Sequence, residues 1–216
     1  MGVIKEGLNL PADKHRRVEI PDCGRRQLPR FCREMGYKVG VEIGVQRGAF
    51  TRRFCREDLN MYGVDPWLAY GDYTVGGLSS YQKHQDQIYE EAKANLAEFP
   101  NCILIRKTSM QALEDFQDES IDFVYIDGHH GFKYVTEDIF EWSKKVKKGG
   151  MISGHDYAYS EPLSYERDAY ILQVKYVVDA YTQAFKIPKW YVLGARNKTF
   201  ENEKRDQYRS WLFFKR

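Results

Sequence analysis

The chain has 216 residues, which suffices for one α/β domain and is too short for two of ordinary size. Its net charge is +2 and charges of both signs are interspersed, so no nucleic-acid partner is expected. No apolar run reaches the roughly 18 residues that a membrane-spanning helix needs, and no secretory signal pattern opens the chain. The four cysteines lack Cys-x-x-Cys spacing, which argues against a zinc knuckle and favours free thiols in a reducing cytoplasm.

Residues 1–24 show no clear period and predict an N-terminal arm before a single domain over 25–216. Apolar residues at helical spacing predict a first helix over 25–35. Strands are then predicted at 39–43, 61–64, 102–106, 121–126 and 151–154, each followed by a helix, at 49–56, 81–98, 110–116, 134–145 and 168–185. This alternation predicts a parallel, doubly wound α/β sheet. The last two strands, 190–193 and 210–214, have no helix between them and should pair antiparallel at its edge.

The glycine turn after the first strand is the most informative feature. Residues 39–50 predict a buried strand that ends in Glu42, then a turn with Gly44 and Gly48, then a helix that starts near Phe50. Glycine permits positive φ and close approach of a ligand, and the helix start presents unpaired N–H groups. A dinucleotide site would show Gly-x-Gly-x-x-Gly, so the Glu-x-Gly-x-x-x-Gly pattern disfavours a nicotinamide oxidoreductase.

That pattern resembles the first motif of the class I S-adenosylmethionine-dependent methyltransferases. The resemblance implies a Rossmann-like, mostly parallel sheet of seven strands with the last one antiparallel. It also implies that Gly44 and Gly48 make room for the methionine end of the cofactor, with Glu42 beneath it.

Asp65 ends the next predicted strand, about twenty residues after the glycine turn, where a carboxylate can accept hydrogen bonds from ribose hydroxyls. It can also simply start a turn with Pro66. Trp67 can wall the ribose and adenine or fill the core. The loop after the third strand borders the adenine in this fold, where Ser109 can bond the base edge and Met110 pack on its face. Ser109 can equally be a helix cap.

Ionisable residues follow two neighbouring strands at their carboxyl ends. Asp127, His129 and His130 come after the fourth strand, and His155 and Asp156 after the fifth. In a doubly wound sheet these ends lie side by side at the ligand crevice. The sequence therefore predicts that these groups converge on one pocket, where Asp127 also borders the cofactor.

The segments 122–138 and 148–157, with Asp-Gly-x-His and Gly-His-Asp-Tyr, resemble macrocin O-methyltransferase and related sugar O-methyltransferases. The resemblance implies a divalent metal on Asp127, His155 and Asp156, although a carboxylate usually stands where His155 does. Magnesium prefers oxygen ligands, whereas imidazole suits manganese, iron or zinc better, so magnesium or manganese is expected. The resemblance also implies that His130 is the general base, with His129 as the alternative.

The sequence thus favours an S-adenosylmethionine-dependent O-methyltransferase acting on a hydroxyl of a sugar, glycan or other small polyol. The expected partners are a small-molecule or glycan substrate, with no membrane or nucleic acid, and a homodimer is left open. The alternative is a metallohydrolase that uses Asp127, His130, His155 and Asp156 to activate water. That alternative leaves the glycine turn and Asp65 without a role.

Overall fold

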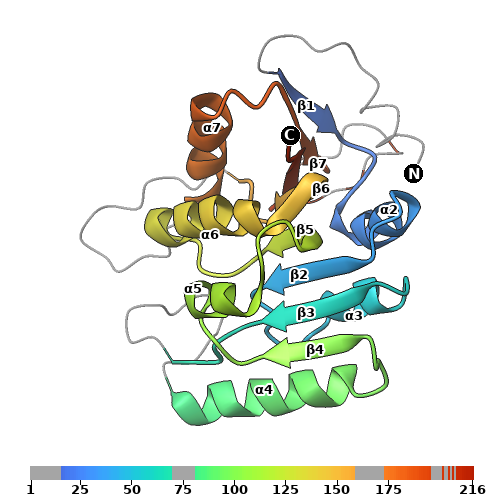
Figure 1. Cartoon of the computed structure of the whole chain (residues 1–216), viewed down its shortest axis with the longest axis vertical. Coiled ribbons are helices and arrows are strands. Elements are labelled where there is room, and N and C mark those ends of the chain that lie inside the picture. Colours follow the sequence, from blue (N-terminus) through green and yellow to red (C-terminus); the bar gives the residue numbers. More distant parts are fainter. Residues whose placement is uncertain are drawn as a thin grey trace.

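The computed structural model describes residues 16–69, 81–158, 173–195, 201, 204, 206 and 208–216. Within these residues, eight strands form one sheet in the order β1-β7-β8-β6-β5-β2-β3-β4 (Figure 1). The strands are β1 Arg16–Ile20, β2 Val39–Ile43, β3 Asn60–Val64, β4 Cys102–Ile105, β5 Ile121–Ile126, β6 Val146–Gly154, β7 Lys189–Leu193 and β8 Ser210–Phe214. All pair in parallel except β8, which runs antiparallel to β6 and β7.

Helices cover both faces of the sheet. They are α2 Leu28–Glu34, α3 Thr51–Cys55, α4 Gln82–Leu96, α5 Ser109–Ala112, α6 Phe132–Lys145 and α7 Val174–Ala184, with 3₁₀ turns η1 Arg25–Gln27 and η2 Leu113–Asp115. Alternate strand residues enter different cores: Val124 packs with α6 and α7, whereas Phe123 packs with α2 and α3. Burial on both faces explains why the central strands read as continuous apolar runs.

The order of the strands creates the place for a ligand. From β2 the chain winds outward through β3 to β4, and it then returns to β5 on the other side of β2. The switch point therefore lies between β2 and β5, and ligands of open α/β sheets bind at the carboxyl ends of strands at such a point. The arrows of β2, β3 and β5 end on the same side of the sheet (Figure 1).

The doubly wound α/β fold is confirmed, with one strand more than the seven expected. Arg16–Ile20, within the segment assigned to an arm, forms β1 and pairs with β7. The antiparallel pairing of β7 with β8 is confirmed, but β8 lies between β7 and β6 rather than at the edge. The first part of the predicted helix 168–185 and most of the long segment after Pro66 lie outside the described residues.

All four cysteines are free thiols, as expected. Among the described helices, none has the length and apolar character needed to cross a membrane.

Candidate functional site

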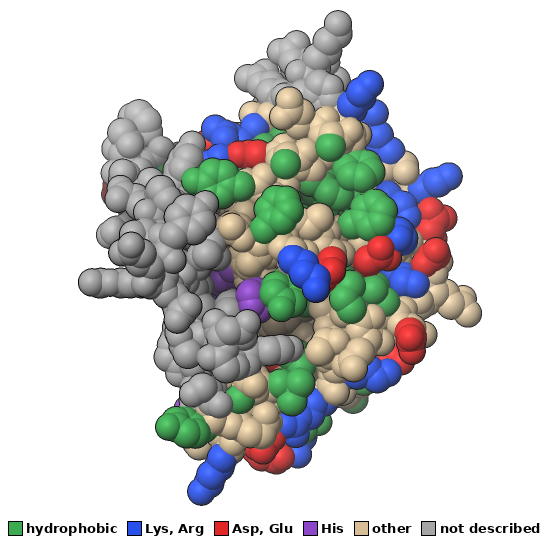
Figure 2. All heavy atoms as spheres, turned by 90° about the vertical axis from the view of Figure 1, so that its left-hand side faces the viewer, with side chains coloured by type: hydrophobic (Ala, Val, Ile, Leu, Met, Phe, Trp, Pro, Cys, Tyr) green, Lys and Arg blue, Asp and Glu red, His purple; other side chains and the backbone are tan. Residues whose placement is uncertain are grey.

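A cavity of about 620 Å³ opens at the carboxyl ends of β2, β3 and β5. Histidine side chains reach the surface on this side of the molecule (Figure 2). The cavity brings together most of the residues that the sequence assigned to the cofactor: Glu42, Gly44, Asp65, Trp67, Ser109, Met110 and Asp127. Gly48 is not among the lining residues.

Gly44 and Gly48 of the turn are each required as glycine, but for different structural reasons. Gly44 has φ +89°, and a Cβ there would lie 2.1 Å from the carbonyl oxygen of Asp127. Gly44 therefore lets the ends of β2 and β5 approach each other, so its space is taken by the chain itself. Gly48 has φ +76°, and a Cβ there would lie 2.7 Å from Cδ1 of Leu96. Gly48 thus serves the packing of α4 rather than the cavity.

The carboxylate of Asp65 accepts hydrogen bonds from the glycine turn after β2 and from the turn that Asp65 itself starts with Pro66. Its Oδ2 accepts a hydrogen bond from the backbone N–H of Gln46 at 2.9 Å, and its Oδ1 accepts one from that of Trp67 at 2.8 Å. Burial raises the pKa of Asp65 above its usual value, although these backbone bonds act in the opposite direction. A carboxylate oxygen accepts more than one hydrogen bond, so both oxygens retain capacity for a ligand. The turn role and the ribose role are therefore compatible.

Trp67 both lines the cavity and fills the core. Its Nε1 donates to the carbonyl of Gln46 at 2.9 Å, and its ring lies 4.6 Å from that of Tyr89. The side chain is buried and the backbone has φ +42°. Trp67 therefore fixes the wall of the cavity next to Asp65.

Glu42 is a buried carboxyl group in the floor of the cavity. It is 1% exposed and accepts a hydrogen bond from the hydroxyl of Thr51 in α3. Burial raises the pKa of Glu42 to about 8, although the hydrogen bond from Thr51 lowers it. The side chain of Glu42 thus links β2 to the following helix α3 at the floor of the cavity.

Ser109 does not cap α5, because Thr108 occupies the cap and accepts from the backbone N–H of Gln111 at 3.3 Å. The hydroxyl of Ser109 instead accepts from Nε1 of Trp142 at 2.8 Å and donates to Oδ1 of Asp138. Asp138 also lines the cavity and is 4% exposed. The sequence interpretation did not identify Asp138 as a site residue.

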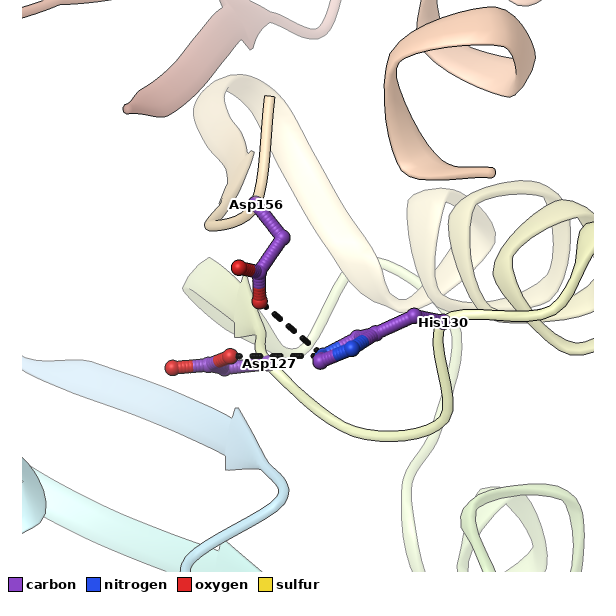
Figure 3. A group of neighbouring side chains, drawn as sticks. All are labelled: Asp127, His130 and Asp156. Carbon is purple, nitrogen blue, oxygen red and sulfur yellow. Dashed lines mark ion pairs between the residues drawn. The ribbon is translucent and has the colours of Figure 1, made fainter. Parts of the chain in front are cut away.

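Asp127, His130 and Asp156 form a compact group beside the cavity. Nε2 of His130 lies 3.0 Å from Oδ2 of Asp156 and 3.7 Å from Oδ1 of Asp127. The side chains of Asp127, His130 and Asp156 come from the end of β5, the loop before α6 and the loop after β6, and they point toward one another (Figure 3). Each offers one ligand atom within 4.8 Å of the others, a separation that can hold a metal ion.

His155 lies at the edge of this group rather than within it. Its Nδ1 is 3.5 Å from Oδ2 of Asp156 and 4.0 Å from Oδ1 of Asp127, while its Nε2 is 3.6 Å from Oδ1 of Asp206. The compact group therefore contains His130, whereas His155, the third ligand that the resemblance implies, lies next to Asp156 at its edge. Asp206 was not anticipated, because it lies far along the chain in a segment without a motif.

Charges around the two imidazoles hold them in the protonated form. Burial alone would lower the pKa of His130, but its contacts with Asp127 and Asp156 raise it to about 9. Burial likewise opposes protonation of His155, and Asp156 and Asp206 raise its pKa to about 9. The same contacts lower the pKa of Asp156. Asp156 is thus anionic at neutral pH and lies against both imidazoles.

Two further residues complete this side of the cavity. Nη1 of Arg25 lies 3.2 Å from Oδ2 of Asp127, a contact that sequence reasoning did not foresee because Arg25 lies far away in the chain. His129 lines the cavity, accepts a hydrogen bond from the backbone N–H of Gly131 at 3.0 Å, and packs its ring 3.9 Å from that of Tyr134. His129 and His130 both border the cavity, but only His130 joins the carboxylate group.

Solved structures of low sequence identity share this fold. TomG from Streptomyces achromogenes, an O-methyltransferase of tomaymycin synthesis solved with S-adenosylmethionine, is 12% identical with a TM-score of 0.62, over 89% of this chain and 79% of TomG. An O-methyltransferase from Bacillus cereus, solved with S-adenosylhomocysteine, is 14% identical with a TM-score of 0.58, over 99% of this chain and 89% of that chain. An rRNA methylase from Streptococcus thermophilus is 13% identical with a TM-score of 0.57, over 88% of this chain and 94% of that chain.

Sequence comparison gives the family. The uncharacterized protein y4gI of Sinorhizobium fredii is 29% identical over 123 residues, which are 54% of this chain and 13% of y4gI. The chain thus spans a small part of the length of that relative. Residues 41–157, more than half of the chain, match the family described as "Methyltransferase domain". These residues run from the glycine turn through Asp65 and Asp127 to Asp156. The chain belongs to this methyltransferase family.

Proposed function

We propose that the protein transfers the methyl group of S-adenosylmethionine to a hydroxyl oxygen of a sugar, glycan or other small polyol. One observation carries the proposal: the Asp127–His130–Asp156 group lies beside a cavity whose lining also contains Asp65. The proposed acceptor site and the proposed cofactor site therefore lie side by side at the switch point of the sheet. The family match favours this function over the metallohydrolase alternative, which receives no support from it.

The cofactor would lie along the carboxyl ends of β2, β3 and β4. Asp65 would accept hydrogen bonds from the ribose, and Trp67 and Met110 would pack on its apolar surfaces. Glu42 and Gly44 would border the methionine end, next to Asp127. Helix α3 has only five residues, so the amide groups of the turn, rather than a long helix, would meet the ligand.

The donor set fits a divalent cation, magnesium or manganese. Asp127 and Asp156 offer carboxylate oxygens, which suit either metal, and the imidazole of His155 beside them, the third ligand that the resemblance implies, favours manganese. Asp127 and Asp156 would hold the cation. When bound, it would lower the pKa of an acceptor hydroxyl.

His130 would accept the proton from the acceptor hydroxyl. Without a cation, Asp127 and Asp156 keep the pKa of His130 at about 9, so the imidazole is already protonated at neutral pH. A cation held by these carboxylates would remove the cause of the raised pKa, and the imidazole of His130 would then be free to act as a general base. The proposal thus explains why a base would stand between two acids.

The fold alone does not identify the acceptor, because an rRNA methylase shares it. The class of the acceptor is therefore inferred from the resemblance of residues 122–138 and 148–157 to sugar O-methyltransferases. The four free cysteines support a reducing compartment such as the cytoplasm.

The test is a methyl-transfer assay with labelled S-adenosylmethionine, manganese or magnesium, and separate panels of nucleotide sugars, polyols, catechols and RNA. The proposal predicts labelled product with the hydroxyl-bearing sugars or polyols. Transfer to RNA alone, or hydrolysis of the acceptors without S-adenosylmethionine, would contradict it.

A further inference from the structure

A directional chain of hydrogen bonds ends on Asp138 in the cavity wall. Nε1 of Trp142 can only donate, so Oγ of Ser109 must accept this bond and direct its own proton to Oδ1 of Asp138. This fixes Oδ1 as an acceptor. For the other oxygen, Oδ2, no hydrogen bond is found within the described part of the chain.

Asp138 is placed to meet a ligand rather than solvent. It is 4% exposed, yet it lines the cavity together with Ser109 and Gly128. Gly128 is a close neighbour of this oxygen, since a Cβ built on it would lie 4.0 Å from Oδ2 of Asp138. Burying a carboxyl group with half its hydrogen-bonding capacity unused is unfavourable. A ligand group that donates to Oδ2 would offset that cost.

The position of Asp138 indicates which part of the ligand it meets. Asp65 marks the ribose at the end of β3, and Ser109 and Met110 lie on the loop after β4, beyond it. The base of a nucleoside held by Asp65 therefore extends toward Ser109 and Asp138. Adenine joined to ribose has one hydrogen-bond donor on its edge, the exocyclic N6 amino group, and its free ring nitrogens only accept.

We propose that Asp138 selects the adenine base of the cofactor by accepting a hydrogen bond from its N6 amino group at Oδ2. Ser109, for which a bond to the base edge was one of two predicted roles, acts one step away as the positioning residue for Asp138. The inference rests on the proposed use of S-adenosylmethionine and adds the residue that distinguishes its base from one that carries a carbonyl at the same position.

The test measures binding of two ligands by isothermal titration calorimetry. S-adenosylhomocysteine carries the amino group, and S-inosylhomocysteine carries a carbonyl in its place. The wild-type protein should prefer S-adenosylhomocysteine by roughly tenfold or more, because the carbonyl leaves a buried acceptor facing an acceptor. Asp138→Asn keeps the shape and an oxygen for Ser109, but presents an amide N–H₂ to the ligand. The Asp138→Asn variant should bind the two ligands equally well or prefer S-inosylhomocysteine.

Glu137→Gln is the matched control, because Glu137 also lines the cavity and undergoes the same chemical change one residue away. It should leave the ratio of the two affinities unchanged. Circular dichroism would verify that both variants fold. If the wild type binds S-adenosylhomocysteine but the ratio is the same in Asp138→Asn, the inference is overturned while the proposed function stands. If the folded wild type binds neither ligand, the proposed function is overturned and the inference with it.

Discussion

The imidazole of His130 faces Asp156, with Nε2 of the histidine 3.0 Å from Oδ2 of the carboxylate. This contact joins the ends of two neighbouring strands, because His130 follows β5 and Asp156 follows β6. It places an imidazole whose pKa is raised to about 9 in the position proposed for a base. The proposed proton transfer would therefore depend on a cation that neutralises these carboxylates.

His130→Ala should lower turnover by about two to four orders of magnitude, the usual effect of losing a general base. Its affinity for manganese, measured by calorimetry, should change little, because Asp127 and Asp156 remain. His129→Ala disturbs the same loop without removing the proposed base and should stay within about tenfold of the wild type. A collapse of manganese affinity in His130→Ala would make His130 a ligand instead. If only His129→Ala is inactive, the base is assigned to the wrong histidine.

Chelation should abolish turnover and leave the affinity for S-adenosylhomocysteine nearly unchanged, because the cation serves the acceptor. Asp156→Asn should reproduce this result, since Asp156 belongs to the carboxylate group but is not among the residues that line the cavity. The measurements are turnover in excess EDTA, restoration by manganese, and calorimetry with S-adenosylhomocysteine. Full activity in EDTA would remove the metal from the account.

Gly44→Ala should destabilise the protein more than Gly149→Ala. Both glycines have positive φ, at +89° and +77°, so both variants incur a backbone strain of about 1 kcal/mol. Only at Gly44 does the new Cβ meet backbone, 2.1 Å from the carbonyl oxygen of Asp127, whereas nothing lies within 4 Å at Gly149. Urea denaturation measures the difference. Equal free energies of unfolding for the two variants would mean that the close approach of β2 and β5 is not rigid.

Glu42→Gln should make stability less dependent on pH. Burial raises the pKa of Glu42 from 4.5 to about 8, so between these values the folded protein binds the proton more tightly than the unfolded chain. The free energy of unfolding therefore decreases as pH rises from about 5 to 8. The glutamine side chain of the variant keeps an oxygen for the hydroxyl of Thr51 and does not titrate. Denaturation at pH 5.5 and pH 8 should show a smaller loss in the variant, and the same loss in both proteins would contradict the shift.

Hydrophobic periodicity sufficed to predict the strands at 39–43, 121–126 and 210–214 with the bounds that the structure shows. These strands combine β-forming residues with clear turn signals, so local pattern and tertiary position agree. The strand β1 escaped prediction because an edge strand with charged residues has a weak pattern. It depends on its pairing with β7, about 170 residues later in the chain.

The convergence of Asp65, Asp127 and His130 on one cavity could be predicted, because strand ends in a doubly wound sheet meet at known places. The roles within it required coordinates. Gly48 fits a ligand turn by spacing, yet its missing side chain makes room for Leu96. Asp138 did leave a signal in the sequence: it lies on the apolar face of α6 with Val135, Ile139 and Trp142, which are all buried. A carboxylate at that spacing points to a buried partner.

Calorimetric titration of the wild type and Asp65→Ala with S-adenosylhomocysteine tests the central claim most directly. The account predicts that the wild type binds one ligand per chain. It predicts that Asp65→Ala weakens binding by about 1–3 kcal/mol, because the ribose hydroxyls lose their acceptor. Circular dichroism would establish that the variant is folded. Absence of binding by the folded wild type, or an affinity unchanged within about twofold in Asp65→Ala, would contradict the assignment of this cavity to the cofactor.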